Sequence, residues 1–281
     1  MDYCIAYFAP SEALRHLVAF NYIFRTSGRA YAAGLGALLG QANWLVRGGV
    51  RYRFCDGTAA AVPGVAVVGP TNGNLAFETA GRVTLVGSSF LPAGWAALAR
   101  VGAGELSDSL ADDRALWGGR ADALLEPLAE ARSDRDRVSL VDSFLAGEIE
   151  RRAVRVDPRV ATIDAWLAGS DRSLNHLLRS IDVSQRQATR IALAAHGAPL
   201  KVLARKYRVL RSAAAFACGQ ATGPGDMAGG DFYDQSHFIR EFQHFLGMTS
   251  SAYLNDAAGV ARALMRQRWQ AGARHPFAIW S

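Results

Sequence analysis

The 281-residue chain has few of the features that would place it in a secreted, metal-bound or membrane class. Its three cysteines, Cys4, Cys55 and Cys218, are far apart and odd in number, which argues against a disulfide framework or a cysteine metal cluster. The first residues lack the basic and apolar regions of a signal peptide. No apolar run approaches the ~18 residues that cross a membrane. We therefore expect a soluble, cytoplasmic protein with no membrane partner.

Charge is unevenly distributed along the chain. Residues 1–150 contain 13 Lys and Arg against 16 Asp and Glu, whereas residues 151–281 contain 18 against 9. Half of all residues are apolar and a fifth are charged, which is typical of a globular protein, and the length suits two domains. The C-terminal half is therefore the part suited to a polyanion.

The N-terminal half has the pattern of a β-rich domain with helices. Short apolar or alternating runs, separated by Gly- and Asn-containing turns, occupy residues 14–25, 42–54, 59–68 and 82–90. Strands at this spacing predict a small barrel or sandwich. Helical spacing follows over residues 93–101, 113–132 and 136–152. These helices either complete the first domain or form a dimerisation face, and the charged residues 151–158 mark the expected boundary.

The C-terminal half predicts a helix-turn-helix unit. A short helix is expected at residues 160–168, and Leu174, Leu177 and Ile181 mark a second. After a break, Ser184-Gln185-Arg186-Gln187 forms a Ser-x-x-Gln capping box that opens a third helix. That helix would bury Ala188, Ile191 and Ala195, and expose Gln185, Arg186, Thr189 and Arg190. A helix, a short turn and a capped helix with such a face are typical of a DNA-binding motif.

A second polar helical face follows about fifty residues later. A long helix over residues 200–217 leads to a Gly-rich stretch at 219–230, and the next helix begins near Asp234. Its apolar stripe is Phe238, Phe242 and Phe245. Its other side carries hydrogen-bonding groups in place of a Glu/Lys mixture: Ser236, His237, Arg240, Gln243 and His244.

These residues resemble a known family. The stretch Phe232-Tyr233-Asp234-Gln235-Ser236-His237-Phe238-x-Arg240-x-Phe242, followed by Gly247-x-Thr249-x-x-x-Tyr253, resembles the double helix-turn-helix domain of AraC/XylS-type transcription regulators. The upstream unit fits through residues 183–187, Arg190, Gly197 and Ala204-Arg205-x-x-Arg208. The resemblance covers about residues 158–254. It implies that two recognition helices enter successive major grooves of double-stranded DNA, roughly 34 Å apart.

The N-terminal half resembles, more loosely, a poorly characterised domain often found before this DNA-binding domain. The resemblance is carried by Phe8-x-Pro10-Ser11, Val68-Gly69-Pro70, Phe90-x-Pro92-x-Gly94 and Leu116-Trp117-Gly118. Relatives in that position often fold as cupin-like barrels that sense a small molecule or dimerise. The resemblance therefore implies a small-molecule effector or a dimerisation role, and leaves contact with RNA polymerase and the choice between monomer and homodimer open.

Several positions depart from the family pattern. Asp231 stands where a glycine is usual, and Tyr233 stands where a small polar cap is usual, so Asp234 would cap the helix instead. Thr249-Ser250 replaces a common Thr-Pro, and Ala192 replaces the usual buried aromatic of the first recognition helix. The Gly-rich residues 219–230 are poor material for the scaffold helix of the second unit.

The resemblance assigns DNA contacts to two groups of residues. Arg186, Arg190 and Arg240 are the expected major-groove contacts, because the arginine fork matches guanine O6 and N7. The other residues of the set are expected to contact bases or phosphates. For Gln187 the alternative is that its side chain is used in the capping box, and for Gln235 the alternative is a structural role at the helix start. The full set is Ser184, Gln185, Arg186, Gln187, Thr189, Arg190, Lys201, Arg205, Gln235, Ser236, His237 and Arg240. Lys201, Arg205 and Arg208 would touch phosphate or solvent.

No enzymatic chemistry is indicated. Ser236 and His237 are adjacent and diverge on a helix, so they cannot act as nucleophile and base. His237, Glu241 and His244 have a spacing that zinc could use, but the order is not His-Glu-x-x-His and no cysteine is near. We expect no catalytic residues, cofactor or metal.

The sequence therefore predicts an α+β, two-domain transcription regulator. A β-rich, barrel- or cupin-like domain with helices would span residues 1–150. An all-α double helix-turn-helix domain would span 155–255, and a helical tail 256–281. The alternative is a small-molecule-binding or dimerisation protein whose DNA-binding domain is degenerate and nonspecific, which Ala192 and residues 219–230 motivate.

Overall fold

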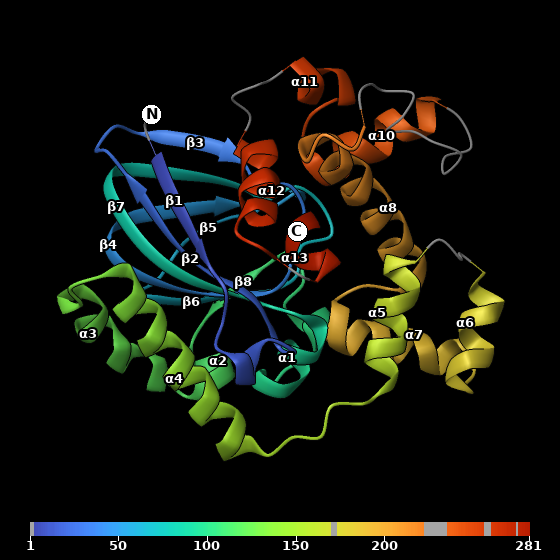
Figure 1. Cartoon of the computed structure of the whole chain (residues 1–281), viewed down its shortest axis with the longest axis horizontal. Helices are drawn as coiled ribbons and strands as arrows, with labels where there is room; N and C mark the ends of the chain where they lie inside the picture. The colour runs from blue at the N-terminus through green and yellow to red at the C-terminus, as the bar shows by residue number, and fades with distance from the viewer. Residues whose placement is uncertain (1–2, 170–172, 222–234, 256–259, 274) are drawn as a thin grey trace.

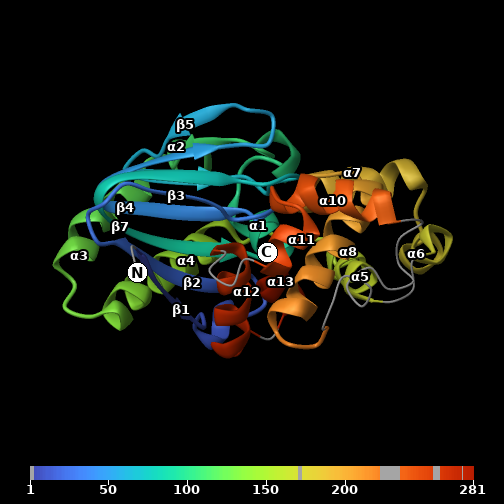
Figure 2. The same cartoon turned by 90° about the horizontal axis from the view of Figure 1, so that it is seen from above.

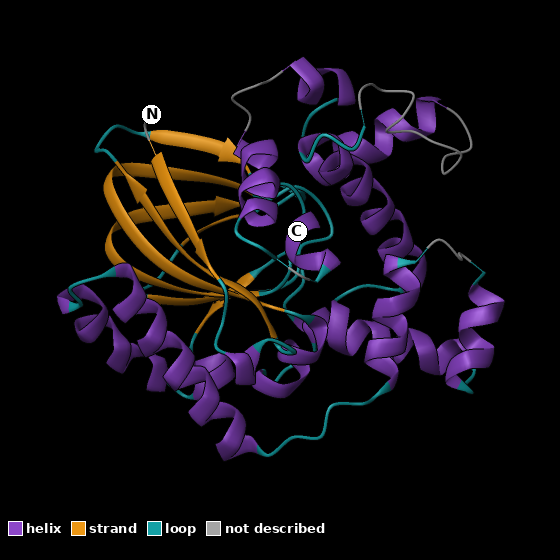
Figure 3. Ribbon diagram, in the orientation of Figure 1, coloured by secondary structure: helices purple, strands orange, loops and turns teal. Residues whose placement is uncertain are grey.

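The computed structural model describes residues 3–169, 173–221, 235–255, 260–273 and 275–281. Its N-terminal part is an antiparallel β-sheet with helices, and its C-terminal part is helical (Figure 1). Figure 3 shows the same division, with the strands gathered in one half of the molecule. The predicted fold class is confirmed.

The strands of the described residues form one curved sheet. Its order is β1-β2-β7-β4-β6-β8, with β3 paired to β7 and β5 to β4, and every pairing is antiparallel. The strands are β1 Tyr3–Phe8, β2 Val18–Thr26, β3 Tyr31–Gly34, β4 Gln41–Arg53, β5 Ala59–Ala61, β6 Val65–Val68, β7 Ala76–Phe90 and β8 Leu110–Asp112.

Two of the predicted runs differ from the structure. Residues 14–25 begin with the last residue of a 3-10 helix, η1 Glu12–Leu14, before β2 starts. Residues 59–68 are split into β5 and β6 at Pro63-Gly64, because proline has no N–H to donate to a neighbouring strand. The short strands β1, β3 and β8 were not predicted.

The two faces of the sheet bury different side chains, as alternation along a strand requires. On β2, Phe20, Tyr22 and Phe24 join a cluster rich in aromatic rings, whereas Ile23 joins a second cluster. In that second cluster Trp44 of β4 stacks on Trp117 with ring centroids 6.1 Å apart. The aromatic cluster lies on the face that the C-terminal tail reaches.

Helices cover the face that holds Trp44. They are α1 Pro92–Leu98, η2 Ala103–Glu105, α2 Arg114–Trp117, η3 Arg120–Leu124, α3 Leu125–Glu130 and α4 Asp134–Arg152. The single helix expected at residues 113–132 is wrong. Gly118 and Gly119 adopt positive φ of 68° and 85°, which ends α2 and turns the chain before η3.

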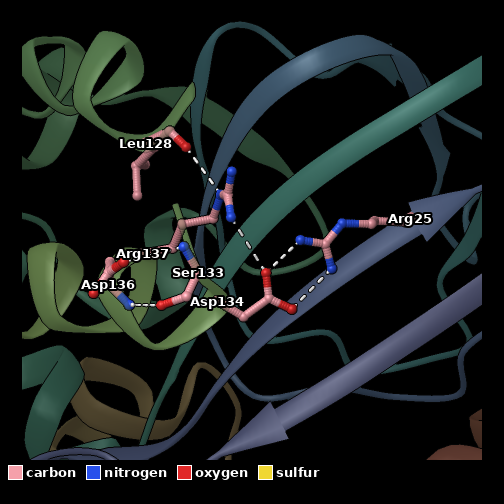
Figure 4. A network of polar contacts seen from close by, with 6 residues as sticks. All are labelled: Arg25, Leu128, Ser133, Asp134, Asp136 and Arg137. Atoms are coloured by element: carbon pink, nitrogen blue, oxygen red, sulfur yellow. Dashed lines mark hydrogen bonds and ion pairs between the residues drawn. The ribbon is translucent and has the colours of Figure 1, made fainter. Parts of the chain in front are cut away.

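Helix α4 is fixed to the sheet at its first turn (Figure 4). Arg25 of β2 pairs with Asp134 through both carboxylate oxygens, and Arg137 donates to Asp134 and to the carbonyl of Leu128. Ser133 and Asp136 form a reciprocal capping box at the start of the helix. These contacts join α4 to the N-terminal domain, so the helix completes that domain's core.

The C-terminal helices lie beside the sheet (Figure 2). They are α5 Arg159–Ala168, α6 Leu174–Ile181, α7 Gln185–His196, α8 Leu200–Ala217, α10 Gln235–Leu246, α11 Ser250–Asn255, α12 Val260–Gln270 and α13 Pro276–Trp280. The tail helices α12 and α13 return to lie between the sheet and α8 (Figure 1). Phe277 of α13 stacks on Tyr207 of α8, with ring centroids 4.1 Å apart. Within the described residues, no helix is long and apolar enough to cross a membrane.

Candidate nucleic-acid interface

The first helix-turn-helix unit consists of α6, a three-residue turn and α7. Asp182 ends α6 with a positive φ of 48°, and Ser184 caps α7 by accepting a hydrogen bond from the Gln187 amide at 3.3 Å. Among the described residues, no hydrogen bond runs from the Gln187 side chain to the Ser184 main-chain amide, so only one half of the predicted capping box is formed. The predicted start of α7 is confirmed.

Helix α7 presents one polar face. Gln185, Arg186 and Arg190 are exposed, while Gln187 and Thr189 are half-buried. On the opposite side Ala188, Ala192 and Ala195 are buried, and Ile191 is half-buried. Ala192 packs in the same apolar cluster as Leu203 of α8. The alanine in place of an aromatic residue therefore leaves this helix packed against the core.

The second unit contributes α10. Phe238, Phe242 and Phe245 are 1%, 0% and 0% exposed, as their spacing predicts. Phe242 contacts both Phe238 and Tyr253 with ring centroids 5.4 Å apart. Ser236 and Arg240 are exposed and His237 is half-buried. The expected cap at Asp234, the departures at Asp231 and Tyr233, and the Gly-rich residues from 222 onward lie outside the described residues, as does the side chain of Gln235.

Helix α11 begins at Ser250, although Thr249-Ser250 stands where AraC/XylS-type regulators commonly have Thr-Pro. The Thr249 hydroxyl accepts a hydrogen bond from the Ala252 amide at 3.1 Å, which caps α11. Ser250 takes the first helical position and is buried. The Thr249 hydroxyl thus stabilises the first turn of α11, which a proline at the first helical position would also favour.

Helix α8 connects the two units. Lys201 is exposed, Arg205 is exposed and paired, and Arg208 is half-buried. Arg205 donates two hydrogen bonds to Glu241 of α10, at 2.7 and 2.6 Å. Burial alone would raise the pKa of Glu241, but the guanidinium outweighs burial and the pKa lies below its usual range. Because Glu241 serves Arg205, and its oxygen lies 3.9 Å from His237, a zinc role for these residues has no support in the described geometry.

Lys206 of α8 is 1% exposed and enters the N-terminal domain. Its ammonium nitrogen donates to the carbonyls of Leu38 and Thr71 at 3.0 and 2.8 Å. Burial lowers the pKa of Lys206 to about 7, and the carboxylate of Asp108 opposes that change.

Most of the residues that position α7 and α10 were not identified from the sequence. Lys206 had a usable signal, because it falls at i+3 in the apolar stripe of Leu203, Tyr207 and Leu210. Glu241 sits on the polar side of its helix. Asn72, Asn74 and Ser107 of the N-terminal domain reach α7 and α10 through tertiary contacts that no local pattern indicates.

Comparison with known proteins gives solved structures but no family model and no curated relative. The chain is similar to ToxT from Vibrio cholerae O395, with a TM-score of 0.49 and 10% identity over 92% of this chain and 99% of that one. It is also similar to unsaturated fatty acid bound wild-type ToxT from strain SCE256, with a TM-score of 0.49 and 10% identity over 85% and 95% of the two chains.

A similarity of 10% identity and a TM-score of 0.49 does not assign a function to this chain. The function is therefore inferred from the geometry of the chain. That geometry has two helices, α7 and α10, each with a buried apolar face and exposed polar side chains, and both follow a β-rich domain. This is the arrangement that the resemblance to AraC/XylS-type regulators implies.

Proposed function

We propose that the chain is a sequence-specific, DNA-binding transcription regulator that places α7 and α10 in successive major grooves. The observation that carries the proposal is that both helices bury an apolar face in one core and leave arginine exposed on the other, at Arg186, Arg190 and Arg240. An exposed guanidinium on a groove-sized helix can pair with guanine, at roughly 1–3 kcal/mol for each good contact. The predicted contacts Ser184, Gln185, Gln187, Thr189, Gln235, Ser236 and His237 remain proposals of the same kind.

Arg205 has a different role in this proposal. Its guanidinium is held by Glu241, so it fixes α10 against α8 and meets DNA only through its exposed edge. Lys201 is exposed one turn earlier and is the better phosphate contact.

The N-terminal domain modulates DNA binding in this proposal, and the sheet supplies a site for an effector. A cavity of about 60 Å³ lies among Tyr22, Gln41 and Tyr52, and Leu264 and Arg268 of α12 also line it. A neighbouring opening of about 330 Å³ contains Arg15, Arg268 and His275. Aromatic rings on one side and a guanidinium on the other favour a small molecule with an apolar body and an anionic group.

Arg268 also makes this site depend on both halves of the chain. Its guanidinium donates to the hydroxyl of Tyr7 at 3.2 Å and to the carbonyl of Ser281, and it lies over the Phe20 ring at 5.1 Å. An effector that competes for Arg268 would loosen the tail from the sheet. The domain limits 1–150, 155–255 and 256–281 remain proposals, with the tail acting as a part of the effector site.

Selection of bound duplexes from a random DNA pool tests the proposal, followed by gel-shift titration of the enriched sequence. Wild type should enrich a bipartite site, and Arg190→Ala and Arg240→Ala should each weaken binding to it, whereas the exposed N-terminal Arg29→Ala should not. If no sequence is enriched and binding follows only salt concentration, the DNA-binding domain is nonspecific and the alternative function holds.

A further inference from the structure

One short loop of the N-terminal domain touches the ends of both recognition helices. Residues 70–74, here called the bridging loop, lie between β6 and β7. The Asn72 side-chain amide donates to the carbonyl of Gly197, directly after α7, at 3.3 Å. Two residues on, the Asn74 main-chain amide donates to the carbonyl of His244, in the last turn of α10, at 3.0 Å. One residue before Asn72, the Thr71 carbonyl accepts a hydrogen bond from Lys206 of α8 at 2.8 Å.

Both recognition helices end in a glycine that packs on this loop. Gly197 and Gly247 have positive φ of 83° and 73°. A Cβ atom at Gly197 would lie 3.2 Å from Cγ of Pro70, and one at Gly247 would lie 2.5 Å from the Asn74 side chain. Glycine is therefore needed at each helix end for two reasons: the left-handed backbone, and the close approach of the loop.

Two further donors of the N-terminal domain reinforce these contacts. The Ser107 hydroxyl lies 2.6 Å from the same Gly197 carbonyl, and the Ala37 amide donates to the Phe245 carbonyl at 2.8 Å. Carbonyls at a helix C-terminus have no partner within the helix. Here the N-terminal domain supplies partners for such carbonyls at the ends of both α7 and α10, so both helices are held from one body.

We propose that the bridging loop fixes the separation of the two recognition helices, so that the N-terminal domain sets which half-site spacing the protein binds. The inference rests on the proposed function. Each base pair inserted between half-sites moves the second one by about 3.4 Å and rotates it by about 34° about the DNA axis. Helices held from one body cannot follow such a change, whereas helices joined only by a flexible connection can.

The alternative is that α8 alone sets the separation, because it packs against both units. The two alternatives differ in what the loop contacts do. If α8 suffices, removal of the contacts to Gly197 leaves spacing selectivity intact. If the bridging loop is needed, selectivity falls while each helix still reads its own half-site.

The test uses the full chain and a selected bipartite DNA site in which the spacing between half-sites is changed by one and two base pairs in each direction. Asn72→Ala/Ser107→Ala removes both side-chain donors to Gly197, and each single variant provides a milder change. Ser133→Ala is the matched control, because it removes one side-chain contact to the main chain in the same domain, at the start of α4 (Figure 4). A duplex with a single half-site measures the recognition helices separately.

We expect wild type and Ser133→Ala to lose affinity by about 10²-fold on the two-base-pair insertion, since two linked contacts act together only when geometry allows both. For the double variant we expect a loss below about tenfold, with unchanged single half-site binding. The loop does not set spacing if the folded double or single variants keep the full wild-type penalty. Absence of any preferred site for wild type would instead remove the proposed function, so the two failures are distinct.

Discussion

Arg205 and Glu241 form a two-point ion pair that joins helix α8 to helix α10. The distances are 2.7 Å from Nε to Oε2 and 2.6 Å from Nη2 to Oε1. The Glu241 side chain is 8% exposed and that of Arg205 is 44% exposed. An arginine expected to contact phosphate or solvent thus binds Glu241 and holds α10 against α8. Loss of the guanidinium would leave a nearly buried carboxylate without its partner.

Arg205→Ala should therefore destabilise the fold by about 1–3 kcal/mol at neutral pH, as expected for a lost hydrogen bond to a charged group. The pKa of Glu241 is lower in the folded chain than in the unfolded one. The stabilisation is therefore present above about pH 4.3 and is lost as pH falls through the lower folded pKa. Urea unfolding at pH 7 and at acid pH measures this difference. The exposed Lys201→Ala is the control, and an equal effect from both variants would assign Arg205 no special role.

Lys206 gives the stability of the fold a second pH dependence, which arises from burial of the amine and not from an ion pair. Burial lowers its pKa from 10.5 to about 7, so between these values the unfolded chain binds more protons than the folded chain. Stability should rise with pH across this window, by up to about 1.4 kcal/mol per pH unit. Lys206→Met should lose that rise relative to wild type, and Lys201→Met should keep it. Parallel urea midpoints for wild type and Lys206→Met from pH 7 to 9.5 would show that Lys206 is not buried as described.

The contact between Gly247 and Asn74 can be measured with a matched glycine. Gly247→Ala and Gly272→Ala both place alanine at positive φ, at 73° and 79°. Only the first brings a Cβ to 2.5 Å from another side chain, whereas nothing lies within 4 Å of the second. Both should pay backbone strain of about 1–3 kcal/mol, and Gly247→Ala should cost more. Thermal unfolding measures the loss of stability in each variant. Equal losses would mean that Asn74 of the bridging loop does not pack closely against Gly247 at the end of α10.

Arg268 makes the effector proposal testable by ligand stabilisation. An apolar carboxylate at about 100 times its Kd should raise stability by about 2.7 kcal/mol, a shift of several degrees in Tm. The alcohol of the same chain length should give less. Arg268→Gln should abolish the difference between acid and alcohol, while Arg266→Gln, an exposed arginine on the same helix, should preserve it. Equal shifts for acid and alcohol in wild type would remove Arg268 as the anion contact.

The sequence predicts the C-terminal helices well because each one carries its own local signals. Ser184 caps α7 at the predicted position, and Phe238, Phe242 and Phe245 are buried as their spacing predicts. The N-terminal half is predicted less completely, because β8 pairs with β6 across the intervening β7 and because the positive φ of Gly118 and Gly119 interrupts a helical pattern. The bonds of Asn72 and Ser107 to Gly197 and the bond of Arg268 to Tyr7 join residues 125, 90 and 261 positions apart, so no window of sequence contains them.

The most direct test of DNA recognition compares which half-site each arginine reads. Wild type, Arg190→Ala and Arg240→Ala are each used to select duplexes from the same random pool, with Arg29→Ala as the control. We expect wild type and Arg29→Ala to enrich two half-sites about one helical turn apart. Arg190→Ala should lose sequence preference in one half only, and Arg240→Ala in the other only, each at a cost of about 1–3 kcal/mol on the intact site. Enrichment of the same full site by both variants would contradict the assignment of α7 and α10 as recognition helices.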